Sequence, residues 1–150
     1  MKNIIILLFV SALFASPAFG QKTVPENVKK EFAKKYPAVQ AVKWGSEEAN
    51  EWEAEFKMNG KEMSASYDEK GTWLESETEI STKDLPAAVA ATLTKDFAGY
   101  KPGEMSIFED PKMKGYEIAL KKGETGLEVV IDNSGKVIKK TEMKKEKEEK

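Results

Sequence analysis

Hydrophobic and polar residues alternate along residues 51–58, which predicts a β-strand with one buried face. The chain repeats this pattern later at a constant spacing, so that the strand around Trp52 matches one around Tyr116. The sequence therefore predicts a duplicated β-meander as its organising unit. The matched pairs are Trp52 and Tyr116, Phe56 and Leu120, Met63 and Leu127, Tyr67 and Ile131, Asp68 and Asp132, and Gly71 and Gly135.

Turn signals separate the strands of each copy. Asn59-Gly60 lies between two alternating runs and predicts a tight hairpin. Residues 68–71 and 132–135 both read Asp-x-x-Gly, a turn pattern; in the second, no glutamate occupies the closing position of a calcium loop. The expected strands are residues 41–44, 51–58, 63–67 and 73–79 in the first copy, and 105–108, 116–120, 127–131 and 137–142 in the second.

An amphipathic helix is predicted ahead of each meander, because hydrophobic residues recur at every fourth position. We expect Thr23 and Glu26 to form a capping box on the first helix, Asp84 to cap the second, and Gly99 to end it. The two helices are closer in sequence than the matched strands are, by three positions, so an insertion of that length is expected in the loop 100–103. The two hydrophobic ridges are Val24, Val28, Phe32 and Tyr36, and Leu85, Val89, Leu93 and Phe97.

These elements predict an α+β fold in which two tandem αβ₄ repeats, residues 21–80 and 81–142, form one antiparallel sheet of about eight strands. Both helices are expected on one face of the sheet, which leaves the other face open and polar. Residues 1–20 combine a basic start, an apolar stretch and Ala18-Phe19-Gly20, and are predicted to be a signal peptide. Residues 143–150 are predicted to be a charged flexible tail.

Composition removes several classes of function. The 150 residues contain no Cys, His or Arg, which excludes disulfides, thiolate or imidazole metal sites and histidine-based triads. Without Arg and without a basic stripe, we expect no nucleic-acid binding. Residues 44–80 carry three Lys against eleven acidic residues, so the first meander is strongly acidic. We therefore expect no cofactor, no catalytic residues and no membrane span after the signal peptide.

The sequence also resembles a known family. The exported precursor, the helix starts Val-Pro-x-x-Val-x-x-x-Phe and Leu-Pro-x-x-Val-x-x-x-Leu, the Trp/Tyr-Glu strand and the Asp-x-x-Gly turn resemble the β-lactamase-inhibitor-like, PepSY-like family of bacterial envelope proteins, over residues 23–142. The resemblance implies a tandem αβ₄ protein of the periplasm or cell exterior. The inhibitor that names the family binds through the concave face of its sheet and an acidic hairpin loop; no functional residue is carried over from it.

We hypothesise an exported binding or inhibitor-like module that contacts an envelope or secreted protein with a basic surface, or a small ligand, through the open sheet face. The sequence leaves the oligomeric state open. An exposed Trp would be a good anchor for a partner. The candidate contact residues are Glu51, Glu53, Glu55, Glu62, Ser64, Ser66, Glu75, Glu77, Trp44 and Trp73.

Two alternatives use the same acidic face. Glutamate and serine oxygens suit calcium, so this face is a candidate cation site. Glu53 with Glu55 or Glu62 also has the spacing of paired carboxylates in a glycoside hydrolase. We rank the hydrolase low, because exposed carboxylates on a flat sheet lack the burial that separates the pKa values of a catalytic pair.

Overall fold

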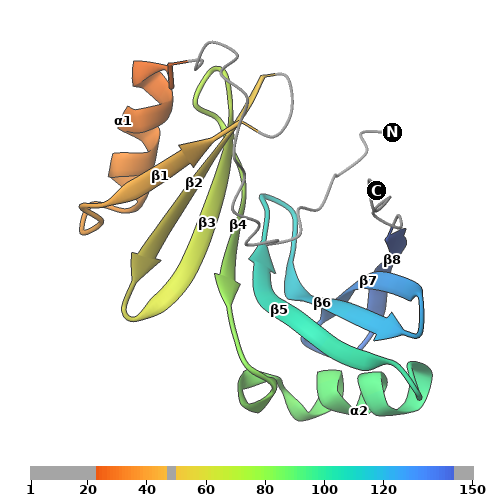
Figure 1. Cartoon of the computed structure of the whole chain (residues 1–150). Coiled ribbons are helices and arrows are strands. Elements are labelled where there is room, and N and C mark those ends of the chain that lie inside the picture. The colour runs from red at the N-terminus through yellow and green to blue at the C-terminus, as the bar shows by residue number, and fades with distance from the viewer. Residues whose placement is uncertain (1–22, 47–49, 144–150) are drawn as a thin grey trace.

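The computed structural model describes residues 23–46 and 50–143, so the predicted signal peptide and residues 144–150 of the predicted tail lie outside it. Eight strands form one antiparallel sheet in the order β1 to β8, each paired with its neighbours in sequence (Figure 1). The expected α+β fold with an eight-stranded sheet is confirmed. The elements are α1 (Glu26–Lys35), β1 (Val42–Gly45), β2 (Glu51–Met58), β3 (Lys61–Asp68), β4 (Trp73–Glu79), η1 (Thr82–Asp84), α2 (Ala87–Asp96), β5 (Lys101–Glu109), β6 (Lys114–Lys122), β7 (Thr125–Asp132) and β8 (Val137–Met143).

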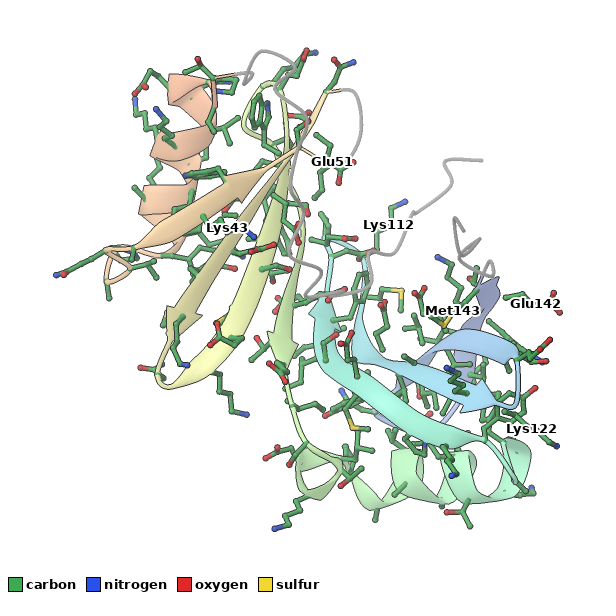
Figure 2. The ribbon with its side chains drawn as sticks, in the orientation of Figure 1. Lys43, Glu51, Lys112, Lys122, Glu142 and Met143 are labelled. Carbon is green, nitrogen blue, oxygen red and sulfur yellow. The ribbon has the colours of Figure 1, made fainter. Side chains whose placement is uncertain are left out.

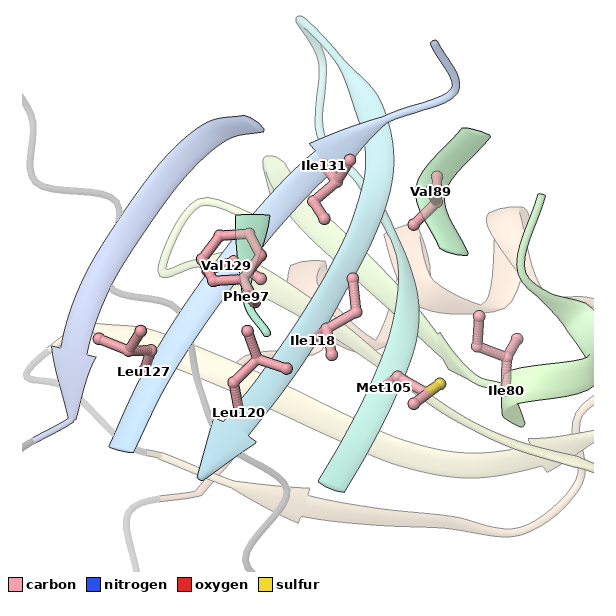
Figure 3. Close-up of a cluster of buried hydrophobic side chains, with 9 residues drawn as sticks. All are labelled: Ile80, Val89, Phe97, Met105, Ile118, Leu120, Leu127, Val129 and Ile131. Carbon is pink, nitrogen blue, oxygen red and sulfur yellow. The ribbon is translucent and has the colours of Figure 1, made fainter. Parts of the chain in front are cut away.

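Each half of the sheet has its own hydrophobic cluster beneath one helix. In the first half, Phe32 of α1 lies 5.1 Å from the ring of Phe56 and 5.3 Å from that of Trp44, both in edge-on contacts. In the second half, Val89 and Phe97, from α2 and its C-terminus, pack on residues of β5, β6 and β7 (Figure 3). The predicted four-residue ridges are thus the buried faces of the two helices, and both helices lie on the same face of the sheet.

The predicted N-terminal caps of the two helices are wrong. Helix α1 begins at Glu26 after Pro25, and α2 begins at Ala87 after Pro86, with no side-chain cap on either helix. A residue before proline is held in extended conformation, so neither helix can begin earlier and Thr23 does not cap the first turn. Asp84 instead accepts hydrogen bonds from the backbone N–H and hydroxyl of Ser81, which closes the short helix η1.

Strand β5 is longer than predicted. Residues 101–103, expected in a loop, belong to the strand, and the pairing with β6 shifts between Pro102 and Met105. The extra residues of the second repeat therefore extend one end of β5 and form a bulge. Alternation could not reveal this segment, because residues 101–104 are all exposed and no hydrophobic face marks them as a strand.

The two Asp-x-x-Gly segments are turns, as predicted, and each also contacts a helix. Asp132 Oδ1 accepts hydrogen bonds from the backbone N–H groups of Ser134 and Lys136, and Asp68 makes the equivalent bonds in the first repeat. Gly135 has a φ of +86°, and a Cβ placed there would lie 2.7 Å from the carbonyl oxygen of Ala88 on α2. Glycine is needed at this position because helix and turn meet backbone to backbone.

Candidate functional site

The sheet face opposite the helices carries most of the polar side chains that the sequence singled out. We call it the concave face. Across β2, β3 and β4, Glu53 lies opposite Ser66, which lies opposite Glu75. Across β5, β6, β7 and β8 the corresponding row is Ser106, Glu117, Val130 and Lys139. Glu77 and Ser64 form a further pair on this face, and Glu128 lies opposite Ala119.

Charges of distant strands act on one another across this face. Burial raises the pKa of Glu75 on β4, and Lys139 on β8 opposes that rise although it lies four strands away. In a flat sheet, four spacings of ~4.8 Å would separate the two strands by ~19 Å. The sheet is bent between its two halves, and both helices lie outside the bend (Figure 1).

Five glutamates on the concave face are buried, which corrects the expectation of an exposed acidic surface. Phe108 and Val130 lie on the same face and are buried with them, outside both helix-side clusters. Curvature brings side chains of distant strands together, so that carboxyls on an open face exclude water from one another. The buried glutamates are Glu53, Glu75, Glu77, Glu117 and Glu128, and the buried serines beside them are Ser64, Ser66 and Ser106.

The burial changes the protonation of these groups. Burial raises the pKa of Glu75 to about 7, and the neighbouring Glu51, Asp110 and Glu53 add to the effect. Burial and the charges of neighbouring carboxyls hold the pKa of both Glu77 and Glu117 above neutrality. Carboxyls at this site therefore retain protons at neutral pH. Of the candidate hydrolase pairs, Glu53 is buried, contrary to expectation, whereas Glu55 and Glu62 are not.

Two carboxyl oxygens at the centre of the face lack a hydrogen-bond partner among the described residues. They are Oε1 of Glu77 and Oε2 of Glu117, and each residue is only 5% exposed. Ser106, on the strand that separates them, lies directly opposite Glu117 and diagonal to Glu77, and its hydroxyl hydrogen-bonds Glu77. A buried oxygen without a partner costs ~1–3 kcal/mol, so this pair is the place where a ligand would gain most.

Two glutamates nearer the β1 edge of the sheet form ion pairs with lysines. Lys43 Nζ lies 2.8 Å from Glu55 Oε2, and Lys57 Nζ lies 2.7 Å from Glu62 Oε1. Glu51 is half-buried and lies opposite Asp68 in the strand register. Lys43 on β1 and Met143 on β8 mark the two edges of the sheet in Figure 2. Of the predicted contact residues, the structure thus groups Glu53, Ser64, Ser66, Glu75 and Glu77 and leaves Glu55 and Glu62 in separate ion pairs.

The two candidate tryptophans do not join this group. Trp44 and Trp73 pack against the helix-side cluster of the first repeat, and both are half-buried. Trp44 contacts Phe32, while the ammonium of Lys35 lies 3.8 Å from the centre of a Trp73 ring. They therefore lie on the opposite face of the sheet from the glutamates.

Sequence reasoning missed Glu117 and Glu128 in the second repeat. The repeat contained the signal, because the spacing that relates Trp52 to Tyr116 also places Glu117 on Glu53 and Glu128 on Ser64. The net charge of this part of the sequence gave no sign of the two carboxyls, because lysines nearby in sequence balance their charge. The face that each position occupies, rather than the charge of the segment, identifies them.

Residues 23–46 and 50–143 contain no group of three or more acidic side chains arranged to hold a metal ion. Neither helix of that part of the chain has the length and apolar character needed to cross a membrane.

Comparison with known families gives a clear match. The sequence profile described as "Putative beta-lactamase-inhibitor-like, PepSY-like" matches residues 50–139. The chain belongs to this family. The PepSY-like match covers strands β2 to β7 and enters β8, so it includes every buried glutamate of the concave face. Comparison with curated proteins gives no significant match.

Solved structures share the fold. A BLIP-like protein from Bacteroides fragilis superposes with a TM-score of 0.75 at 18% identity, covering 87% of this chain and 94% of its own. A DUF2874 family protein from Bacteroides ovatus gives 0.73 at 23% identity, covering 81% and 89%. A protein from Bacteroides eggerthii, described as "putative periplasmic", gives 0.72 at 19% identity, covering 81% and 90%. These similarities show that the architecture of this PepSY-like chain is shared.

Proposed function

We propose that this PepSY-like protein is a non-catalytic binding module of the cell envelope, whose concave face binds a basic segment of another protein. The observation that carries the proposal is the gathering of five buried glutamates from β2, β4, β6 and β7 on one face. Removing carboxyls from water is costly unless they gain a partner. A positively charged partner would offset that cost, and the family relationship supports a binding role.

An exported location supports the same proposal. Residues 1–20 have the order of a signal peptide, and one structural relative is described as "putative periplasmic". With cleavage after Gly20, the mature chain would begin at Gln21 and meet its partner outside the cytoplasm. N-terminal sequencing of the protein from its native host tests this step, and an intact Met1 would contradict it.

Affinity capture from an envelope extract tests the proposed binding face. We would compare residues 21–150 with a variant carrying Glu75→Gln, Glu77→Gln and Glu117→Gln, and with a control carrying Glu26→Gln, Glu31→Gln and Glu69→Gln. The control replaces the same number of carboxyls on the helix side. We expect one basic protein that the wild type and the control retain, that the triple variant loses, and that elutes as salt rises. Equal capture by all three would refute the proposal.

A carboxylate-based hydrolase is the second candidate, because the raised pKa of Glu75, Glu77 and Glu117 would let one of them act as a general acid. Such an enzyme also needs an ionised carboxylate beside the acid. Here burial raises the pKa of the neighbouring Glu128 as well, which ranks this candidate second. Turnover of a panel of nitrophenyl glycosides that disappears in Glu77→Gln and Glu117→Gln would reverse the ranking.

A further inference from the structure

The centre of the concave face has the features of a receptor for a single cationic group. Glu77 on β4 and Glu117 on β6 are separated by one strand, β5, whose Ser106 lies opposite Glu117 and diagonal to Glu77. Glu77 lies opposite Phe108 and Glu117 lies opposite Ser106, so in a flat sheet the two backbones would lie ~12 Å apart, a distance that curvature and the reach of two glutamate side chains shorten. Each glutamate has one buried oxygen without a hydrogen-bond partner among the described residues.

We infer that Glu77, Ser106 and Glu117 form a socket for one arginine guanidinium of the partner, and that binding releases protons from the two glutamates. This inference rests on the proposed function and specifies its chemistry. The unpartnered oxygens Glu77 Oε1 and Glu117 Oε2 would each accept an N–H from opposite sides of the guanidinium.

Other cations fit the socket less well. A calcium ion takes six to eight oxygen ligands, and the described residues contain no group of acidic side chains arranged for it. A lysine ammonium is a compact, strongly hydrated charge and loses more hydration on burial than a guanidinium does. A guanidinium carries five N–H donors in one plane, so it can bridge two acceptors that lie apart.

The surroundings of the socket explain why protons leave when the cation arrives. Glu53 and Glu75 face Glu77 from β2 and β4, and Glu128 faces both carboxyls from β7, so neighbouring negative charge favours protonation. Lys139 from β8 opposes this effect at Glu117, while Glu51 and Asp110 act from further away through Glu75. A guanidinium between the two carboxyls would favour their ionised forms and lower their pKa values.

Calorimetric titration tests the inference with four acetylated, amidated tetrapeptides as probes. Each consists of a single residue type: arginine, lysine, citrulline or glutamine. Titrations of residues 21–150 in phosphate and in Tris measure proton release, because the two buffers differ in heat of ionisation. We expect tetra-arginine binding to tighten at least tenfold between pH 6 and 8, with protons released to the buffer. The citrulline and glutamine peptides, which lack charge, should not bind. Lysine binding as tight as arginine binding would overturn the guanidinium assignment.

Variants separate this socket from general attraction to an acidic protein. Glu77→Gln with Glu117→Gln should weaken tetra-arginine binding at least tenfold at pH 8 and abolish proton release. Glu26→Gln with Glu69→Gln replaces as many carboxyls on the helix side and should change neither. Ser106→Ala should weaken binding less than the double variant, and thermal melting verifies that each variant folds. Unchanged tetra-arginine binding in the double variant would overturn the socket. The proposed function would still stand in that case if the triple variant failed to capture the basic protein from the envelope extract.

Discussion

Lys139 occupies in the second repeat the position that Glu75 occupies in the first. The row Glu53, Ser66, Glu75 in β2 to β4 corresponds, at the spacing that relates Trp52 to Tyr116, to Glu117, Val130, Lys139 in β6 to β8. At this matched pair of positions, one residue is thus acidic and the other basic. The concave face brings the two repeats together, so Lys139 acts on carboxyls of both.

Replacing Lys139 by Met should raise the pKa of the carboxyls around it. Burial already raises the pKa of Glu117 and Glu128, and Lys139 opposes the rise in both. Carbon-13 NMR of the glutamate side-chain carboxyls across a pH titration measures the change. Lys140→Met, on the neighbouring exposed position of β8, is the matched control and should leave these titrations unchanged. Identical curves for Lys139→Met and wild type would show that Lys139 does not act on these carboxyls.

The protein should become less stable as pH rises through neutrality. The folded state holds protons on Glu75, Glu77 and Glu117 that the unfolded chain loses near the ordinary glutamate pKa. Their contribution to the free energy of unfolding is therefore fully present below about pH 4.3 and is lost as pH rises through the raised values, which for Glu75 is about 7. Each unit of raised pKa corresponds to about 1.4 kcal/mol.

Melting temperatures between pH 5 and 9 measure this loss. We expect them to be highest near the acidic end and to fall steadily, and Glu77→Gln with Glu117→Gln should make the fall shallower because Gln keeps its hydrogen-bonding shape without ionising. A melting temperature that is constant or rises over this range would show that the carboxyls are ionised in the folded protein.

Gly135→Ala should destabilise the second repeat by about 2–4 kcal/mol, because two costs combine. The new Cβ would lie 2.7 Å from the carbonyl oxygen of Ala88, and the φ of +86° is itself unfavourable for Ala. Gly123→Ala is the matched control, since Gly123 also has a positive φ of +58° but no atom within 4 Å of the new Cβ. Urea denaturation should give a loss of about 1 kcal/mol for the control. Equal losses of unfolding free energy in both variants would show that the contact between turn and helix does not contribute to stability.

Phe32→Ala should cost about 3–5 kcal/mol, because it empties the centre of the first cluster. The ring of Phe32 contacts the rings of Tyr36, Trp44, Phe56 and Tyr67. Chemical denaturation followed by tryptophan fluorescence reports the change, with a red shift of native emission as Trp44 gains water. The exposed Lys30 on the same helix gives a control, and Lys30→Ala should change the stability by less than about 0.5 kcal/mol.

Local patterns predicted the parts of the fold that depend on near neighbours in sequence. The Val28 and Val89 ridges, the Asn59-Gly60 hairpin and the Asp68 turn each require only periodicity or a turn residue, and all are confirmed. Helix caps failed because Pro25 and Pro86 restrict the preceding residue, a backbone effect that outweighs the side-chain preference at Thr23 and Asp84.

The site was harder to predict, because its chemistry comes from curvature. Alternation correctly put Glu53 and Glu77 on the face away from the helices, but it says nothing about how far that face bends. The protonation of Glu77 depends on residues up to three strands away, such as Glu128, which no local pattern connects to it. The sequence could identify which residues share a face, while their protonation depends on the three-dimensional shape of the whole sheet.

The two halves of the sheet have separate hydrophobic clusters, and β4 and β5 join them through four residue pairs, between Ser76–Glu79 and Ser106–Glu109. The relative position of the two halves, and with it the shape of the concave face, therefore depends on a short run of backbone pairing to which Glu77 and Ser106 themselves belong.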